Sequence, residues 1–138
     1  MKTYIPLTIL VLFYFYLVQK RAPYPLIDEI FHVPQAQKYC AREFWYWDSK
    51  ITTPPGLYLF SVIFREITRL PCTVTFLRAT NVLNIFLIHS LVKRISGNNL
   101  KAFAVASNPL LLTFSCLYYT DVFSITTILL FLYKGLGK

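Results

Sequence analysis

Two adjacent carboxylates, Asp28 and Glu29, lie in the one long polar segment of an otherwise apolar chain, with His32 and Gln35 close behind them. A carboxylate can take the proton from an attacking hydroxyl group. Adjacent like charges beside a low-dielectric medium also raise the pKa of one of the two acids. The pair is therefore a candidate general base. Two alternatives remain: a solvated acid pair in a loop, or negative charge that stabilises the start of a following helix.

Three further polar residues could contribute to a site. His32 is four residues from Asp28, so on a helical turn the two side chains would meet. A hydrogen-bonding or plain interfacial histidine is favoured there over a metal ligand. Arg78 interrupts an apolar run, and its planar fork suits a pair of phosphate oxygens; the alternative is a side chain that snorkels to the nearby interface. Asp121 ends another apolar run, where a lone aspartate is typical of a helix N-cap.

The composition indicates an integral membrane protein. Of the 138 residues, 56% are hydrophobic and only 14% are charged, whereas soluble domains carry about 25% charged residues. The net charge is +8, but the basic residues flank apolar segments instead of forming a polar domain. That distribution fits lipid headgroups and excludes nucleic acid as the expected partner. No glycine-rich phosphate-binding motif or metal-ligand spacing is present, so no cofactor or metal is expected.

The hydrophobic pattern predicts an all-α polytopic membrane protein with about three to four transmembrane helices. The first is expected to be an uncleaved anchor instead of a signal peptide, because no small-residue cleavage pattern follows it. Residues 19–72 form a polar loop, with a short helix from Pro34 to about Arg42. Leu57–Ile67 is too short to span a bilayer, so it is expected to be interfacial or re-entrant. The expected spans are 1–18, 73–92, 102–119, with a kink at Asn108–Pro109, and 122–138.

The Lys/Arg bias predicts the orientation. If Lys2 is cytoplasmic and Leu57–Ile67 does not cross, the basic residues at 93, 94 and 101 are cytoplasmic as well. The 19–72 loop and Asp121 then share the opposite face. Cys40 and Cys72 would pair there if that face is oxidising, or they are two scattered thiols.

Several strings of residues carry a family resemblance. Residues 28–40, 47–48 and 51–59, together with 77–78, 81–83 and 117–121, are similar in order and spacing to the dolichyl-phosphate-glucose α-1,2-glucosyltransferases of the Alg10/Die2 type. The longest string, Asp28-Glu29-Ile30-Phe31-His32-Val33-Pro34-Gln35-Ala36-Gln37, resembles the first luminal loop of that family.

The resemblance implies a GT-C-type glycosyltransferase fold in the endoplasmic reticulum membrane. It implies transfer of the terminal α-1,2-linked glucose, with inversion, from dolichyl-phosphate-glucose to the dolichyl-pyrophosphate-linked oligosaccharide used in protein N-glycosylation. By the same resemblance Asp28 is the expected base and Glu29 the second choice. Arg78 would face the donor phosphate, Asp121 would approach the same cavity, and His32 and Gln35 would contact substrate.

Family members are several times longer than this chain. Residues 1–138 thus correspond to the amino-terminal part of a GT-C domain, and a chain that ends at Lys138 is expected to be inactive by itself. The alternative is a small membrane interaction or regulatory protein without catalysis.

Overall fold

The computed structural model describes residues 3–137, which form seven α-helices and no strand. In chain order these are α1 (Tyr4–Arg21), α2 (Glu29–Cys40), α3 (Gly56–Thr68), α4 (Val74–Ser96), α5 (Asn99–Ala106), α6 (Pro109–Ser115) and α7 (Thr120–Gly135).

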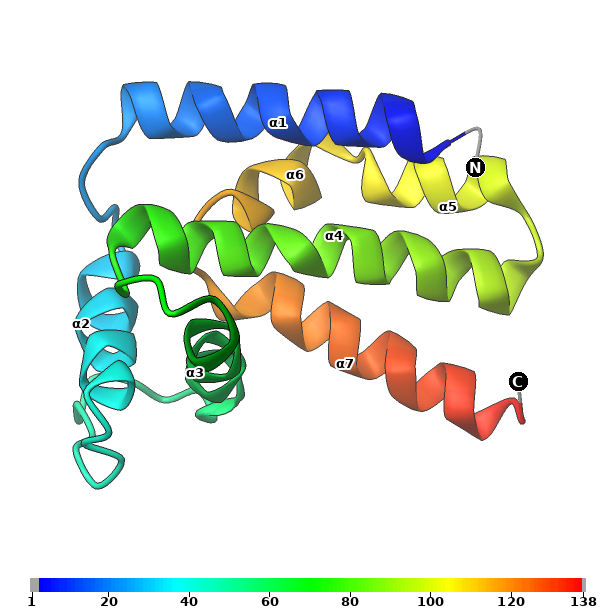
Figure 1. Cartoon of the computed structure of the whole chain (residues 1–138). Helices are drawn as coiled ribbons and strands as arrows, with labels where there is room; N and C mark the ends of the chain where they lie inside the picture. Colours follow the sequence, from blue (N-terminus) through cyan, green and yellow to red (C-terminus); the bar gives the residue numbers. More distant parts are fainter. Residues whose placement is uncertain (1–2, 138) are drawn as a thin grey trace.

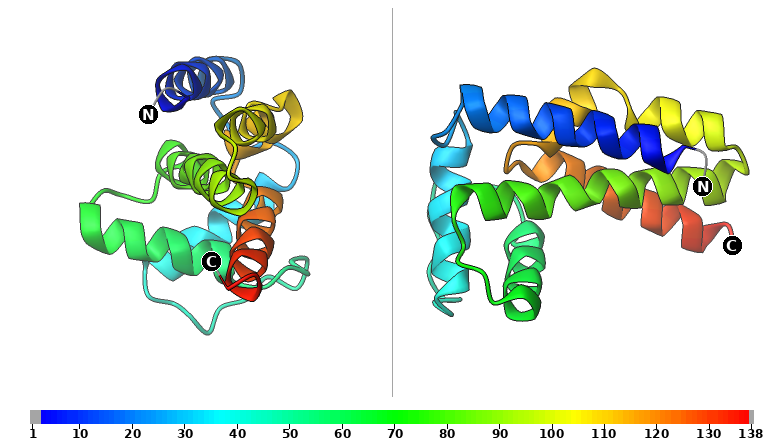
Figure 2. Two further views of the ribbon diagram at one scale, coloured as in Figure 1. Left: turned by 90° about the vertical axis from the view of Figure 1, so that its right-hand side faces the viewer. Right: turned by 45° about the horizontal axis from the view of Figure 1, so that its top comes forward.

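The long helices run between the same two ends of the molecule (Figure 1). α4 is central and packs against both α5 and α7, while α1 packs on α5 and α6. The end-on view in Figure 2 shows this arrangement of α1, α5, α4 and α7. α2 and α3 pack on each other across one end of the bundle, where α1 ends and where α4 and α7 begin (Figure 1). This end carries all the polar features described below.

Most expected helices are confirmed, but the predicted span 102–119 is not one helix. It divides into α5 and α6 at Ser107–Asn108, and it ends early, at Ser115. Pro109 has no N–H to continue α5. The Asn108 side-chain oxygen accepts hydrogen bonds from Leu110 N and Leu111 N and so starts α6. The expected kink is thus a complete break. Residues 1, 2 and 138 of the predicted end spans lie outside the described residues.

The helix predicted to start at Pro34 starts five residues earlier, at Glu29. Its first turn is closed by the Asp28 carbonyl, which accepts from Phe31 N and His32 N. Pro34 sits in the second turn, where it removes only its own backbone hydrogen bond. The short helix expected near Leu57–Ile67 is confirmed as α3.

Two apolar clusters hold the fold together. The larger joins α1, α4 and the α5–α7 region, and the smaller joins α2, α3 and the start of α4 around Leu57, Tyr58 and Leu77. A disulfide between Cys40 and Cys72 ties the end of α2 to the segment before α4, with the two Cα atoms 6.5 Å apart. The pairing that the sequence left open is therefore present, while Cys116 is free and buried.

Among residues 3–137, only α4 is by itself long and apolar enough to cross a bilayer. The α6–α7 pair, bent by 111°, would supply a second crossing if it is counted as one span. Large apolar side chains also point outward from α1 and α7, which is unusual for a surface in contact with water. These are Ile5, Ile9, Leu12 and Phe13 on α1, and Ile128, Leu130, Phe131 and Leu132 on α7.

Candidate functional site

A polar cavity of about 360 Å³ opens where the start of α2, the 50–53 segment and the start of α7 meet. These segments lie at the end of the bundle that α2 crosses (Figure 1). Two carboxylates, one imidazole and one ammonium group line it, and hydroxyl groups supply most of the remaining polar surface. The lining residues are Asp28, Phe31, His32, Lys50, Ile51, Thr52, Thr53, Tyr119, Thr120 and Asp121.

Asp28 and Asp121 face this cavity from two different helices. Asp28 is the residue immediately before α2, and Asp121 is in the first turn of α7. Both side chains are exposed. The two acids, which the sequence places on one membrane face, thus line one cavity in the structure. The N-cap interpretation of Asp121 is wrong, because the N-cap position of α7 belongs to Tyr119.

His32 lines the same cavity and is held from behind by α3. Its Nδ1 is 2.6 Å from the hydroxyl oxygen of Tyr58, a fully buried side chain. Burial lowers the pKa of His32, and the carboxylates of Asp28 and Asp121 offset that effect only in part. The ring is therefore neutral at pH 7, so one nitrogen donates and the other accepts a hydrogen bond.

Glu29 does not face the cavity, although it is the neighbour of Asp28. Its side chain is fully buried and forms a two-pronged ion pair with Arg78 of α4: Arg78 Nε donates to Oε1 at 2.8 Å and Nη2 donates to Oε2 at 2.5 Å. Oε1 also accepts from Tyr118 N at 2.6 Å, and Oε2 accepts from Leu26 N at 3.0 Å. Both carboxylate oxygens are thus fully engaged.

Arg78 is equally occupied. Besides its bonds to Glu29, Nη1 donates to the carbonyl of Ala22 at 2.7 Å and to Gln19 Oε1 at 3.5 Å. Nη2 also donates to the carbonyl of Tyr24 at 3.0 Å. An arginine has five N–H donors, and these contacts use all of them. The sequence interpretations of Arg78 as a phosphate ligand and of Glu29 as a second base do not fit this geometry, and Arg78 does not snorkel.

The ion pair keeps Glu29 charged. Burial by itself would raise the pKa of Glu29, but the hydrogen bonds from Arg78 and from two backbone N–H groups outweigh it and lower the pKa. A carboxyl held ionised in this way is a poor proton acceptor. Of the two adjacent acids, only Asp28 lines the cavity.

Gln35 also has a structural position instead of the expected substrate contact. It is buried; its Nε2 donates to the carbonyl of Tyr46 at 2.8 Å, and its Oε1 accepts from Asp48 N at 3.0 Å. The side chain therefore fixes the aromatic 43–48 segment against α2.

The sequence did not single out Lys50, Tyr58 or Tyr119. Lys50 lies over the Phe31 ring at 5.2 Å on the cavity wall. Tyr119 donates from its hydroxyl to the Leu26 carbonyl at 3.2 Å. Tyr58 and Tyr119 belong to the family-like strings 51–59 and 117–121, so position within those strings was the available signal.

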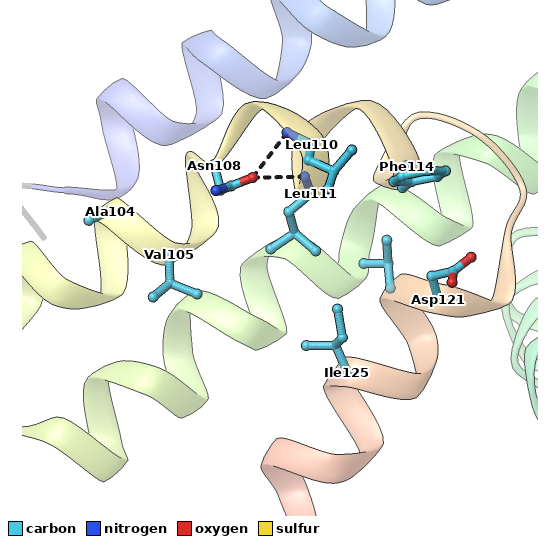
Figure 3. A pocket seen from close by; sticks show the side chains of 9 residues that line it. Ala104, Val105, Asn108, Leu110, Leu111, Phe114, Asp121 and Ile125 are labelled. Atoms are coloured by element: carbon cyan, nitrogen blue, oxygen red, sulfur yellow. Dashed lines mark hydrogen bonds between the residues drawn. The ribbon is translucent and has the colours of Figure 1, made fainter.

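Asp121 also borders a second cavity of about 610 Å³ between α5, α6 and α7 (Figure 3). Its lining is apolar except for Asn108 and Asp121, and the Asn108 oxygen is used to start α6. Asp121 thus stands where a polar and an apolar hollow meet. Within residues 3–137, no group of three or more His, Cys, Asp or Glu side chains is arranged to hold a metal ion.

Comparison with known proteins places this arrangement in a family. The sequence profile described as "DIE2/ALG10 family" matches residues 22–137. No solved structure matches the chain. Three relatives each carry the name Dol-P-Glc:Glc(2)Man(9)GlcNAc(2)-PP-Dol alpha-1,2-glucosyltransferase.

The relative from Yarrowia lipolytica is 38% identical over 132 residues, which cover 86% of this chain and 25% of the relative. The one from Gibberella zeae is 42% identical over 141 residues, covering 83% and 20%. The one from Drosophila melanogaster is 43% identical over 117 residues, covering 77% and 26%. This chain therefore spans about a quarter of the length of these relatives, and it belongs to the DIE2/ALG10 family.

Proposed function

We propose that this chain is the amino-terminal part, residues 1–138, of a GT-C-type membrane enzyme. That enzyme transfers the terminal α-1,2-linked glucose from dolichyl-phosphate-glucose to the dolichyl-pyrophosphate-linked oligosaccharide. The relatives named above carry this activity in their names. The observation that carries the proposal is that Asp28 and Asp121, 93 positions apart in the sequence, line one polar cavity.

The proposed location is the endoplasmic reticulum membrane, with the cavity at the luminal boundary and α1, α4, α5–α6 and α7 in the bilayer. The basic last turns of α4 and α7 lie at the opposite end of the bundle (Figure 1), as the positive-inside rule requires of a cytoplasmic face. The Cys40–Cys72 disulfide lies at the cavity end, and disulfides persist in oxidising compartments such as the lumen. The outward apolar faces of α1 and α7 then contact lipid.

In the proposed reaction, the Asp28 carboxylate accepts the proton of an acceptor sugar hydroxyl. The hydroxyl oxygen forms a bond to the anomeric carbon of glucose as the bond from that carbon to the dolichyl phosphate oxygen breaks, with inversion. The electron pair leaves with the phosphate. Base catalysis of this kind contributes about 10²–10⁴-fold to the rate.

The other cavity residues have supporting roles in the proposal. Asp121 and the neutral His32 bind sugar hydroxyl groups, and Tyr58 sets the orientation of the His32 ring. A lipid-linked sugar needs polar and apolar surfaces side by side, and Asp121 stands between the polar cavity and the apolar one. Glu29, Gln35 and Arg78 hold the walls of the cavity instead of contacting substrate.

The direct test is expression of the full-length enzyme, of which this chain is the proposed amino-terminal part, in a yeast strain whose own Dol-P-Glc α-1,2-glucosyltransferase gene is deleted. The strain accumulates the lipid-linked glycan that carries two glucoses. We expect the expressed gene to convert it to the three-glucose form, as measured by chromatography of the released glycans. Membrane-inserted protein with no three-glucose product would contradict the proposal.

A further inference from the structure

The Glu29–Arg78 pair holds a short non-helical segment in addition to its own helices. Residues 116–119, here called the α6–α7 break, form a turn that belongs to neither α6 nor α7. Glu29 Oε1 accepts from Tyr118 N at 2.6 Å across 89 residues of sequence. From α4, Asn81 Nδ2 donates to the carbonyls of Leu117 at 2.6 Å and Tyr119 at 3.2 Å. Two buried side chains thus bind one backbone donor and two backbone acceptors of the break.

Such binding is necessary because the break is buried. An unpaired backbone group away from water destabilises the fold by several kcal/mol in an apolar medium. Arg78 and Asn81 are three residues apart on α4 and face the same direction. Both residues therefore lie on one face of α4. Arg78 binds Glu29, and Asn81 binds the break.

The same contacts fix the segment that precedes Asp28. The Glu29 carboxylate accepts a hydrogen bond from Leu26 N. The Tyr119 hydroxyl donates to the Leu26 carbonyl, and Arg78 donates to the Tyr24 carbonyl. Ile27, the residue after Leu26, adopts φ +47°. This left-handed conformation is strained for a β-branched residue and persists only where its surroundings impose it. Asp28 is the next residue, and Asp121 lies two residues after the break.

We infer that Glu29, Arg78 and Asn81 are positioning residues for glucosyl transfer, a role that rests on the function proposed above. They hold the Asp28 segment and the α6–α7 break to one face of α4. The two cavity carboxylates are thereby kept in fixed register on opposite walls. None of the three residues touches substrate; they act through Asp28 and Asp121.

The test measures geometry and turnover separately on the full-length enzyme, of which this chain is the proposed amino-terminal part. Spin labels are attached at Ile30→Cys in the first turn of α2 and at Ser124→Cys in α7. Both positions are exposed, Cys116 is buried, and the other two cysteines are bonded to each other. The distance distribution between the labels is recorded for the labelled protein without further substitution, called the reference. It is also recorded for Asn81→Ala and for Glu29→Gln, the milder variant. Thr126→Val is the matched control, because Thr126 is also buried but bonds only to Val122 of its own helix.

We expect one narrow distribution in the reference and in Thr126→Val, and a broadened distribution in Asn81→Ala and Glu29→Gln. Turnover per folded molecule, counted by protection of the Cys116 thiol, should fall at least tenfold in both positioning variants, with KM for dolichyl-phosphate-glucose within threefold of the reference. Unchanged distributions, or unchanged turnover per folded molecule, would overturn the inference. A reference protein with a narrow distribution but no transfer would instead overturn the proposed function.

Discussion

Replacement of Arg78 by methionine should reverse the sign of the pH dependence of stability. Glu29 and Arg78 are both completely buried, and the pair is closed by four hydrogen bonds to the Glu29 oxygens. In Arg78→Met, the carboxylate keeps its burial and loses its cation. Removal of one partner of a buried pair destabilises a protein by about 3–5 kcal/mol. For a domain of this size that corresponds to a fall in Tm on the order of 10–20 °C at pH 7.

The direction in which stability changes with pH follows from the pKa of Glu29. In the reference, that pKa lies below its ordinary value near 4.5. Its stabilising contribution is therefore complete above about pH 4.5 and is lost as the pH falls through the lowered value. In Arg78→Met, burial dominates and the pKa of Glu29 rises above the ordinary value. The variant should therefore gain stability between pH 7 and pH 5, a range in which the Glu29 contribution in the reference stays constant.

Cys116 provides the assay. It is the one free cysteine of the three and is fully buried, so we expect it to react with a maleimide only after unfolding. Labelling against temperature in detergent gives Tm at each pH. Arg42→Met is the control, because Arg42 pairs with Glu66 in an exposed contact, and no change beyond experimental error is expected. Glu29→Gln combined with Arg78→Met should recover at least half of the lost Tm, because no unpaired buried charge remains. An Arg78→Met variant as stable as the reference protein, or one whose loss of stability does not depend on pH, would show that Glu29 does not need Arg78 to stay charged.

Three other predictions concern the surroundings of the cavity. Ile27→Gly should raise the free energy of unfolding by about 1 kcal/mol, because glycine adopts the left-handed conformation of Ile27 without strain. Ile27→Val should bring no gain, and equal Tm values for the two would show that Ile27 is not strained. Cys40→Ala with Cys72→Ala should lower stability by about 3–4 kcal/mol, the chain-entropy value for a loop of 32 residues. A reductant should lower the stability of the reference by the same amount and should leave the stability of the double alanine variant unchanged. A loss of stability of that variant in reductant would contradict the assignment of the disulfide to Cys40 and Cys72. Tyr58→Phe removes the 2.6 Å contact to His32 and should lower stability by about 1 kcal/mol. It should also lower turnover per folded molecule several-fold, and full turnover would remove His32 orientation from the proposed mechanism.

The sequence predicted the helices and the common location of Asp28 and Asp121 because both depend on local patterns. Apolar runs gave the positions of α1, α4 and α7. The distribution of basic residues placed Asp28 and Asp121 on one face, and the structure brings both to one cavity. Asn108–Pro109 predicted a kink, and the structure has a complete break between α5 and α6 at this point. Each of these inferences needs only neighbouring residues and their periodicity.

The roles of Glu29, Gln35 and Arg78 could not be predicted in the same way. Each of these side chains is satisfied by groups far away in the sequence: Arg78 is 49 positions from Glu29, and Glu29 is 89 positions from Tyr118. Residue type suggested chemistry for all of them, and only the tertiary contacts distinguish a reactive acid from a structural one. The start of α2 at Glu29 depends likewise on the backbone bonds that the Asp28 carbonyl accepts, which the position of Pro34 in the sequence does not reveal.

The central claim is that Asp28, and not its neighbour Glu29, takes the proton in glucosyl transfer. The most direct measurement is single-turnover transfer from dolichyl-phosphate-glucose in membranes that contain Asp28→Asn, with the amount of folded protein counted by Cys116 protection. We expect normal folding, normal donor binding and a transfer rate lower by about 10²–10⁴-fold. Transfer at the reference rate by folded Asp28→Asn protein would contradict it.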